Sequence, residues 1–237
     1  MRVAIHQPHY LPWLGYLHRM AQADLFILLD HVQFERGNYQ NRTPVRVNGA
    51  AHWLTVPVIQ RSQKERILDK AVDNSRDWAQ AHYETLRRAY TGAGYFSAYG
   101  ARLKRVYESR WERLVDLNAA LLEVLRDAFA IGTALVKSSE LCMQGAKSEL
   151  VLNLCKAVGA RTLIVGLGGS RAYLDRAAFA EAGIALELQQ FVHPVYPQRG
   201  LASFTPGLSA LDVLFNCGPD SRRRLLGELP RECRIAA

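Results

Sequence analysis

Short apolar runs alternate with longer helical patterns along this chain, and this alternation constrains the fold most strongly. Six runs have the length and composition of strands, at residues 3–5, 25–29, 52–58, 133–138, 162–166 and 184–191. Strands that alternate with helices build a mainly parallel sheet with helices on its faces, because each strand returns through a crossover. The sequence therefore predicts an α/β fold with a mainly parallel sheet.

A longer apolar repeat interrupts the alternation between the third and fourth runs. Apolar residues recur there at three- and four-residue spacing over 99–129, which predicts one long helix. Another helix is expected after Ser75, the predicted N-cap, with Asp77 in its first turn. We expect residues 77–130 to form a helical insert or lid.

The remaining boundaries follow from the same patterns. Helices are expected over 147–158 and from about Tyr173. No repeat or low-complexity linker divides the sequence, so we predict a single domain over 3–218. A basic C-terminal tail, 219–237, is expected to follow it.

Length and composition indicate a cytoplasmic globular protein. The chain has 237 residues, of which 49% are hydrophobic, enough for the core of one large domain. No run of eighteen apolar residues occurs and the first residues lack a signal-peptide pattern, so neither a membrane span nor a leader is expected. Four cysteines are too sparse for a disulfide scaffold, which favours a reducing compartment.

The charge is basic but dispersed. Lys and Arg number 30 against 22 Asp and Glu, which gives a net charge of +8. Acids are interleaved with the basic residues, and the only dense basic cluster is at 222–224. Nucleic-acid binders concentrate charge in patches with exposed aromatics, so the pattern weighs against that class. It suits a phosphate-bearing small molecule, because a few arginines suffice to bind phosphate.

The loop after the first strand combines polar and rigid groups, in the sequence HQPHYLPWLGY. Ligands of parallel sheets bind at the carboxyl ends of strands. Prolines would hold His6, Gln7, His9 and Tyr10 on a stiff loop at that place. We predict His6 or His9 as a general base and Gln7 and Tyr10 as substrate contacts. In the alternative, the aromatics plug the sheet and the imidazoles cap backbone groups.

Asp30 ends the second strand, where its carboxylate is expected to orient one of these imidazoles. Capping a turn is its alternative role. The stretch DHVQFERGNYQNR that follows is rich in amides. Gln33, Asn41 and Arg42 are therefore predicted to contact the substrate.

Two loops are candidates for binding phosphate. In the polar segment at 59–67, Lys64 could close over a phosphate together with Arg61 and Arg66, although a solvated loop has the same composition. In GLGGSRAYLD, a strand runs into glycines and then a helix start. Such turns bind anions, so Gly169, Ser170 and Tyr173 are predicted to contact substrate, but similar turns also occur without a ligand.

A second polar, proline-containing loop, HPVYPQ, follows the last strand. His193, Tyr196 and Gln198 are predicted to contact substrate there, and the loops 3–16 and 191–198 are expected to form opposite walls of one cleft. The next segment, LSALDVLFNCG, predicts an amphipathic helix capped by Ser209. Its Asp212 is expected either to contact substrate or to anchor the loops from below.

The sequence requires no metal or cofactor. His6 and His9 are only three residues apart on an extended loop, and no helical pair of metal ligands occurs. A divalent cation could still bind through a substrate phosphate. Cys155 and Cys217 lack the neighbours of a catalytic thiol and are expected to be buried.

One distant likeness concerns the nucleotidylyl transferases, whose Rossmann-type fold carries an HxGH helix start after its first strand. Trp13, Leu14, Gly15 and Tyr16 occupy the equivalent positions here. The glycine is kept and both histidines are missing. The likeness therefore extends to the fold more than to adenylyl transfer.

A longer series of motifs spans nearly the whole chain. HQPHYLPWLGYLHRMAQADLFILLDHVQF, NYQNR, HWLTVPV, GLGGSRAYLD, HPVYPQ and LSALDVLFNCG resemble, in this order, segments of the WbqC-like family. Its members are associated with O-antigen and lipopolysaccharide biosynthesis. The resemblance implies transfer of an acyl or aminoacyl group, such as glycyl, to an amino sugar.

Together these features predict an enzyme that transfers an acyl or aminoacyl group to an amine of a nucleotide-linked or phosphate-bearing amino sugar. Its partners would be a nucleotide sugar and an acyl donor. Three alternatives stay open: ATP-dependent nucleotidylyl-transfer or ligase chemistry, nucleotide-sugar binding without catalysis, and nucleic-acid binding, which a strongly salt-dependent affinity for RNA would favour.

Overall fold

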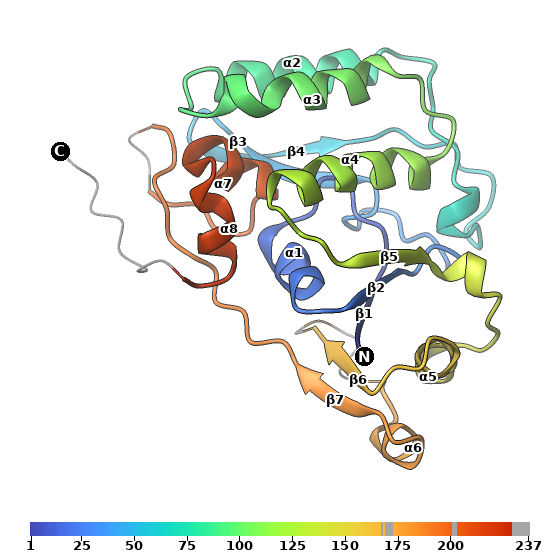
Figure 1. Ribbon diagram of the computed structural model, residues 1–237. Coiled ribbons are helices and arrows are strands. Elements are labelled where there is room, and N and C mark those ends of the chain that lie inside the picture. Colours follow the sequence, from blue (N-terminus) through green and yellow to red (C-terminus); the bar gives the residue numbers. More distant parts are fainter. Residues whose placement is uncertain (167, 169–172, 201–202, 229–237) are drawn as a thin grey trace. The chain divides into compact units, whose positions relative to one another are not determined.

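The computed structural model describes residues 1–166, 168, 173–200 and 203–228 (Figure 1). The chain divides into two compact units that are interleaved in sequence. The first unit contains residues 1–8, 18–32 and 132–191. The second contains 9–17, 33–131 and the chain from Val192 onward. The prediction of a single domain with a tail stays a prediction.

The first unit is built on a five-stranded sheet. Its strands are β1 (Arg2–His6), β2 (Leu25–Leu28), β5 (Ala134–Lys137), β6 (Thr162–Val165) and β7 (Ala185–Leu188). All neighbours pair in parallel, in the order β5-β2-β1-β6-β7. This confirms the predicted α/β fold with a parallel sheet. Numbered along the chain within this sheet, the order is 3-2-1-4-5, that of doubly wound sheets.

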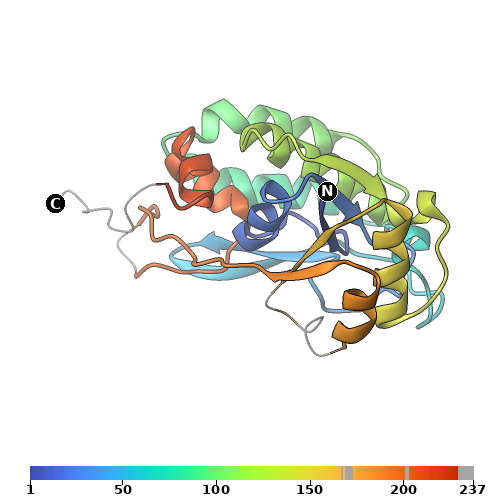
Figure 2. The ribbon, with the colours of Figure 1, turned by 60° about the horizontal axis from the view of Figure 1, so that its bottom comes forward.

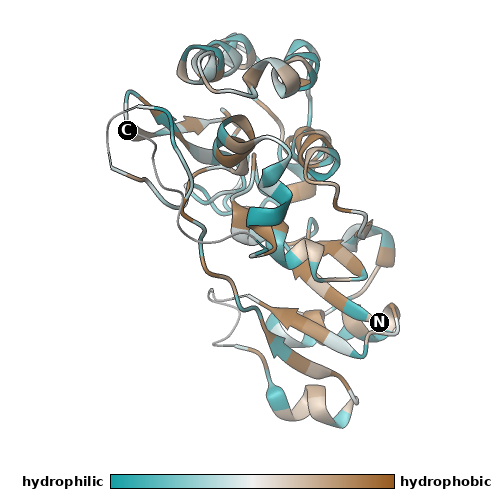
Figure 3. Ribbon diagram, turned by 60° about the vertical axis from the view of Figure 1, so that its left-hand side comes forward, coloured by the Kyte–Doolittle hydropathy of each residue, from teal (hydrophilic) through white to brown (hydrophobic). Residues whose placement is uncertain are grey.

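Helices α5 (Lys147–Ala157) and α6 (Arg176–Glu181) cover one face of this sheet (Figure 2). Val3, Leu163 and Val165 point to that face and form one buried cluster with Leu154 of α5 and Phe179 of α6. Leu163 and Val165 share a face because successive side chains of a strand point to opposite faces of the sheet. The strands of the sheet are largely brown, that is hydrophobic, in Figure 3, as expected of a sheet that is buried on both faces.

Two short elements complete the first unit. The 3-10 helix η2 (Ser138–Leu141) follows β5, and α1 (Leu14–Ala21) connects β1 to β2. The first half of α1 belongs to the second unit and its last half to the first. Helix α6 begins at Arg176, not near Tyr173 as predicted, because the Asp175 side chain accepts hydrogen bonds from the backbone amides of residues 177 and 178.

The second unit contains an antiparallel hairpin of β3 (Arg42–Val47) and β4 (Ala50–Thr55). The sequence prediction placed a strand at 52–58 and missed β3. Asn48 and Gly49, both with positive φ, form the turn. An Asn-Gly pair between two strands is a strong hairpin signal, so this element could have been recognised.

Helices α2 (Trp78–Tyr90), α3 (Phe96–Glu108) and α4 (Leu114–Ala128) follow, preceded by the 3-10 helix η1 (Ile67–Asp69). The single helix predicted over 99–129 is wrong. The first helix ends at Glu108 and the next begins at Leu114, with Ser109 and Arg113 in extended conformations between them. The Leu114 amide donates to the carbonyl of Lys70 at 2.9 Å. The predicted cap is also wrong, because Asp77 and not Ser75 is the N-cap of α2.

The unit ends in α7 (Ala210–Cys217) and α8 (Asp220–Leu225). Ser209 caps α7, as predicted, by accepting from the Leu211 amide. Part of the segment predicted to be a tail is thus a helix, with Leu225 buried. Arg222 of α8 donates to the carbonyls of Phe129, at 3.0 Å, and Ala130.

Candidate functional site

The carboxyl ends of the five strands in the first unit meet at one edge of the sheet. Five polar or flexible residues lie there: His6 at the end of β1, Asp30 after β2, Ser138 after β5, Gly166 after β6 and Gln189 after β7. The strand order changes direction between β1 and β6. In doubly wound sheets this switch point is where ligands bind. The edge is therefore the candidate site.

His6 is the last residue of β1, beside the switch point. Its side chain is half-buried, and Nδ1 lies 3.1 Å from the carbonyl oxygen of Gln7. A carbonyl can only accept, so Nδ1 carries the proton and the lone pair of the neutral ring lies on Nε2. This geometry suits a base whose Nε2 receives a proton.

Asp30 lies 1% exposed, next to η2. Its carboxylate accepts from the hydroxyl of Ser138 at 2.9 Å, and from the hydroxyl and amide of Ser139 at 2.7 and 2.9 Å. Nδ1 of His31 lies 2.6 Å from the Ser138 hydroxyl. These bonds tie the end of β2 to the end of β5. The predicted role of Asp30 in orienting His6 or His9 stays a prediction.

Polar residues of α1 reach the same edge, and the sequence analysis missed them. His18 is buried, and its Nδ1 accepts from the Gln189 amide at 3.0 Å. Burial lowers the pKa of His18, so the ring is neutral at neutral pH. Its ring also contacts Phe191, with centroids 5.1 Å apart. The available signal was a histidine and an arginine within a helix that is otherwise apolar.

Arg19, the next residue of α1, is only 7% exposed and lines a cavity of about 40 Å³. The cavity lies between residues from the ends of β1 and β6, with Ile5 and Gly166 among its lining. A Cβ placed on Gly166 would come within 2.7 Å of the Arg19 Cζ. The glycine thus leaves room for the guanidinium beside β6.

His9 and Tyr10 belong to the second unit. His9 is 7% exposed, and its ring lies 5.2 Å from that of Tyr16 and 5.5 Å from that of Tyr39. Tyr10 has no exposed surface, and its hydroxyl hydrogen-bonds to His82 Nδ1 at 2.8 Å and to the Tyr107 hydroxyl at 2.5 Å. Burial raises the pKa of Tyr10 well above its ordinary value. Both side chains are thus packed against other side chains of this unit; the predicted catalytic role of His9 and the substrate contact by Tyr10 stay predictions.

The HPVYPQ segment surrounds a buried carboxylate of the second unit. Asp212 of α7 has no exposed surface and accepts from the hydroxyls of Tyr90 and Tyr196, each at 2.9 Å, and from the Gln198 amide at 2.8 Å. Gln198 in turn accepts from the guanidinium of Arg46. Burial raises the pKa of Asp212, and the hydrogen bonds offset part of that rise. Asp212 thus anchors this segment from within.

His193 opens the same segment with both ring nitrogens bonded. Nδ1 donates to the Pro194 carbonyl at 2.9 Å, and Nε2 accepts from the Gly207 amide at 3.2 Å. Burial lowers its pKa, which keeps the ring neutral. His6 and Asp30 fall in the first unit and His9 and His193 in the second. Their convergence on one cleft stays a prediction.

Three further predicted contacts lie in the second unit. The Asn41 amide donates to the Val56 carbonyl at 2.9 Å, and Gln33 donates to the Gln63 carbonyl at 2.8 Å. The Arg42 guanidinium lies 4.4 Å from the ring centroid of Trp53, which is 41% exposed. Asn41 and Gln33 thereby hold backbone in place, while Arg42 stacks on an exposed aromatic. Substrate contact by each of them stays a prediction.

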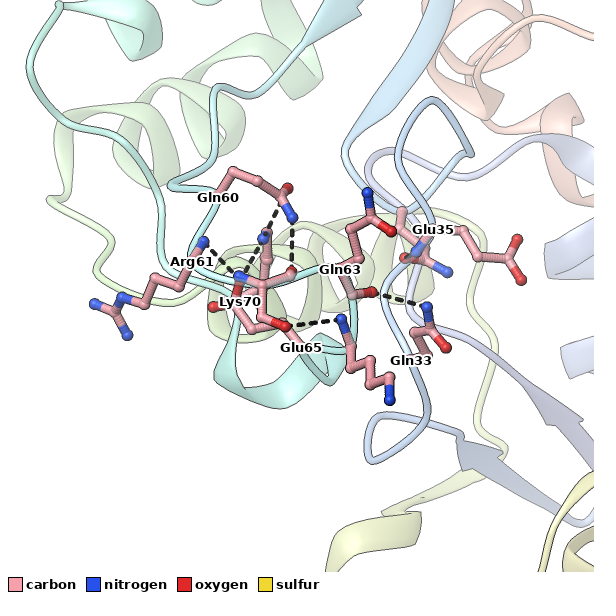
Figure 4. A network of polar contacts seen from close by, with 10 residues as sticks. Gln33, Glu35, Gln60, Arg61, Gln63, Glu65 and Lys70 are labelled. Atoms are coloured by element: carbon pink, nitrogen blue, oxygen red, sulfur yellow. Dashed lines mark hydrogen bonds and ion pairs between the residues drawn. The ribbon is translucent and has the colours of Figure 1, made fainter.

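The polar segment at 59–67 folds around a buried ion pair (Figure 4). The Lys70 side chain has no exposed surface, and its Nζ lies 2.7 Å from Oε2 of Glu65. That carboxylate also accepts from the Arg61 amide at 3.1 Å. Burial raises the pKa of Glu65, but its hydrogen bonds together hold it below the ordinary value. Arg66 forms an exposed ion pair with Asp69 at 2.6 Å, and its contact with a phosphate stays a prediction.

Of the other candidate phosphate contacts, Lys64 is exposed. Gly169 and Ser170 lie outside the described residues, and Tyr173 is 43% exposed and lines the same cavity as Arg19.

The predicted burial of Cys155 and Cys217 is confirmed, and burial raises the pKa of the Cys155 thiol to about 12. No cluster of three metal-ligating side chains occurs among the described residues. No helix within the described part of the chain is long and apolar enough to cross a bilayer.

Comparison with known proteins assigns the family. The model of the WbqC-like protein family matches residues 7–224, almost the whole chain. The chain belongs to the WbqC-like protein family. It is 30% identical over 223 residues to the uncharacterized protein Rv1507c of Mycobacterium tuberculosis (strain ATCC 25618 / H37Rv), covering 93% of this chain and 95% of that protein. No solved structure matches, so the likeness to nucleotidylyl transferases gains no support beyond the strand order.

Proposed function

We propose that this WbqC-like protein is an enzyme that transfers an acyl or aminoacyl group, such as glycyl, to an amine of a nucleotide-linked or phosphate-bearing amino sugar. We place the reaction at the carboxyl edge of the first unit's sheet, within surface polysaccharide biosynthesis. The observation that carries this proposal is His6, half-buried at the end of β1 beside the switch point, with its proton on Nδ1.

An amine attacks a carbonyl carbon only when its nitrogen lone pair is not protonated, and it must lose a proton as the new bond forms. Nε2 of His6 takes this proton in the proposed reaction. A nitrogen–carbon bond forms while the bond between the carbonyl carbon and the donor's leaving group breaks, and the leaving group departs with that electron pair. His6 is a better candidate than His9, because His9 is packed between two tyrosine rings.

The test mixes the protein with a nucleotide-linked amino sugar and an activated acyl or glycyl donor, and detects the amide product by mass spectrometry. His6→Gln should lower kcat by roughly a hundredfold or more, because the general base is lost, while the melting temperature stays near that of the parent. His52→Gln, at an exposed position of β4, is the matched control. Full activity of a folded His6→Gln variant would refute the assignment of the base.

The same mixture separates the alternatives. The doubly wound strand order also suits a nucleotide ligand, so ATP-dependent chemistry would be recognised by release of pyrophosphate or ADP. A nucleotide sugar that binds without any product would indicate a binding protein. Addition of a chelator tests whether a divalent cation participates through the substrate phosphate.

A further inference from the structure

The sheet of the first unit has two edges, and they differ in how they are protected. Its outermost strands are β5 and β7 (Figure 1). An open edge strand attracts further strands, which proteins prevent with lysine, proline or a bulge. β5 carries Lys137, whereas β7 (ALEL) has neither lysine nor proline, and its uninterrupted register with β6 leaves no bulge. The one charged residue of β7, Glu187, is paired within the unit, with Arg2 at 2.6 Å.

The outer side of β7 presents unpaired backbone groups. The amides of Ala185 and Gln189 donate to carbonyls on the β6 side, at 2.9 and 2.8 Å. Because alternate residues of a strand direct their backbone groups to the same side, those of Leu186 and Leu188 point away from β6. Among the described residues, no other strand pairs with that side and no other backbone group bonds to it.

A groove of about 440 Å³ lies beside β7, between the strand and α6. Ala180 of α6, Gly183, Ile184 and Leu186 are among its lining residues. Ile184, Leu186 and Leu188 follow one another at two-residue spacing on the face that α5 and α6 cover, and both leucines are only half-buried. Parallel sheets are normally buried on both faces. This edge therefore leaves apolar surface that a further strand would cover.

The apolar pattern is symmetric about Leu186, which indicates a second copy of the chain as the added strand. A twofold axis at Leu186 places this residue opposite its own copy, and Ile184 opposite Leu188 of the other copy. The outward amide and carbonyl of Leu186 then bond to those of its copy, and the Leu188 side chain of each strand lies over the groove of the other. An axis at Glu187 would instead bring two carboxylates directly opposite each other, which is unfavourable.

We propose that the protein forms a dimer in which β7 pairs antiparallel with β7 of a second copy, about an axis at Leu186, so that the two five-stranded sheets become continuous. The pairing covers the open edge of both copies, and assembly therefore stops at two chains. Antiparallel pairing places the carboxyl edges of the two sheets on opposite sides, so each candidate site stays within its own chain. The inference is independent of the proposed reaction.

Disulfide trapping tests the register, in a full-length background with Cys142→Ser and Cys233→Ser, whose other cysteines are buried. Opposite residues of a hydrogen-bonded pair have Cα atoms about 5.5 Å apart, within reach of a disulfide, whereas diagonal neighbours at about 7–8 Å are too distant. Leu186→Cys should therefore form a covalent dimer on oxidation with diamide, and Glu187→Cys should not. The reverse result, or no covalent dimer in either variant, would overturn the proposal.

Light scattering over a dilution series measures the strength of the dimer. The parent should approach twice the molar mass of one chain as its concentration rises. Leu186→Lys should raise the dimer dissociation constant at least about tenfold, because it replaces a pair of leucines by two like charges. Leu135→Lys, at a half-buried leucine of the opposite edge strand β5, is the matched control and should change this constant less than about twofold.

A parent that is monomeric at every concentration would contradict the inference, as would a dimer that Leu186→Lys leaves intact. Leu186→Cys decides the matter if Leu186→Lys fails to fold, which its melting temperature shows. The proposed function fails separately, because amide formation is measured on the same samples. A dimer without acyl transfer refutes only the reaction, and acyl transfer by a monomeric parent refutes only the dimer.

Discussion

At the carboxyl edge of the first unit's sheet, Arg19 lines a cavity and His6 is half-buried, whereas in the second unit Asp212 has no exposed surface and accepts three hydrogen bonds. His6 belongs to the segment HQPHYLPWLGY, and Asp212 is bonded to the segment HPVYPQ. Both segments combine histidine, tyrosine, proline and glutamine. A polar group can act on a ligand only when its atoms can reach one. Composition alone does not separate a site from a buried polar network, whereas accessibility does.

The largest expected effect is on stability and concerns Asp212, the buried carboxylate of the second unit. Asp212→Ala leaves the hydroxyls of Tyr90 and Tyr196 and the amide of Gln198 without their acceptor, so it should lower the free energy of unfolding by about 3–5 kcal/mol. Urea denaturation measures this change. Asp220→Ala, at a side chain that is 55% exposed, should cost far less. An Asp212→Ala variant as stable as the parent would mean that the network contributes nothing.

A second buried group of that unit should make stability depend on pH. Burial lowers the pKa of His82 to about 4 from 6.5. Between these values the unfolded chain binds a proton that the folded protein does not, so the contribution of His82 falls as pH drops from 6.5 to 4. The loss is on the order of 3 kcal/mol and is absent above pH 6.5.

Urea denaturation between pH 4 and pH 7 measures this slope. His82→Gln should be less sensitive to acid than the parent, although His18 and His193, whose pKa values are also lowered, retain their share. His52→Gln, at an exposed histidine, should change the slope far less than His82→Gln does, because the charge of His52 is the smallest of the causes that act on the pKa of His82. Identical slopes in the parent and His82→Gln would contradict the assignment.

Variants of His9, in the loop after β1, test whether this histidine has a packing role or acts as a general base. His9→Ala removes a ring from between Tyr16 and Tyr39 and should cost about 2 kcal/mol of stability. His9→Phe keeps an aromatic ring and should recover at least half of that loss. A general base would behave in the opposite way: stability would stay intact in both variants, and turnover would fall in both.

The smallest effect is expected at Lys64. Its side chain is exposed, on a segment held by the buried pair of Glu65 and Lys70. Lys64→Ala should therefore change pyrophosphate affinity less than about twofold, in the range of an exposed charge. A tenfold loss would restore the predicted phosphate-binding role of this segment.

The parallel sheet could be predicted because each strand is a short apolar run between helical patterns. The break between α3 and α4 could not, because the apolar spacing continues through 109–113 and the extended conformation there depends on pairing with residues 70–72. The polar groups at the edge were partly predictable. His6 stands directly after an apolar run, whereas the contact between His18 and Gln189 joins residues 171 positions apart. Local patterns carry no information about such a pair.

The central position of β1 has a consequence for how the chain folds during synthesis. β1 pairs with β2 on one side, but on the other it pairs with β6, where Arg2 lies opposite Thr162. At roughly 5–20 residues per second, the ribosome needs on the order of ten seconds to make the intervening chain. Throughout that interval one side of the apolar first strand is an open edge, the kind of surface that promotes aggregation. Nascent chains that stop before residue 162 should therefore depend on chaperones far more than the finished protein does.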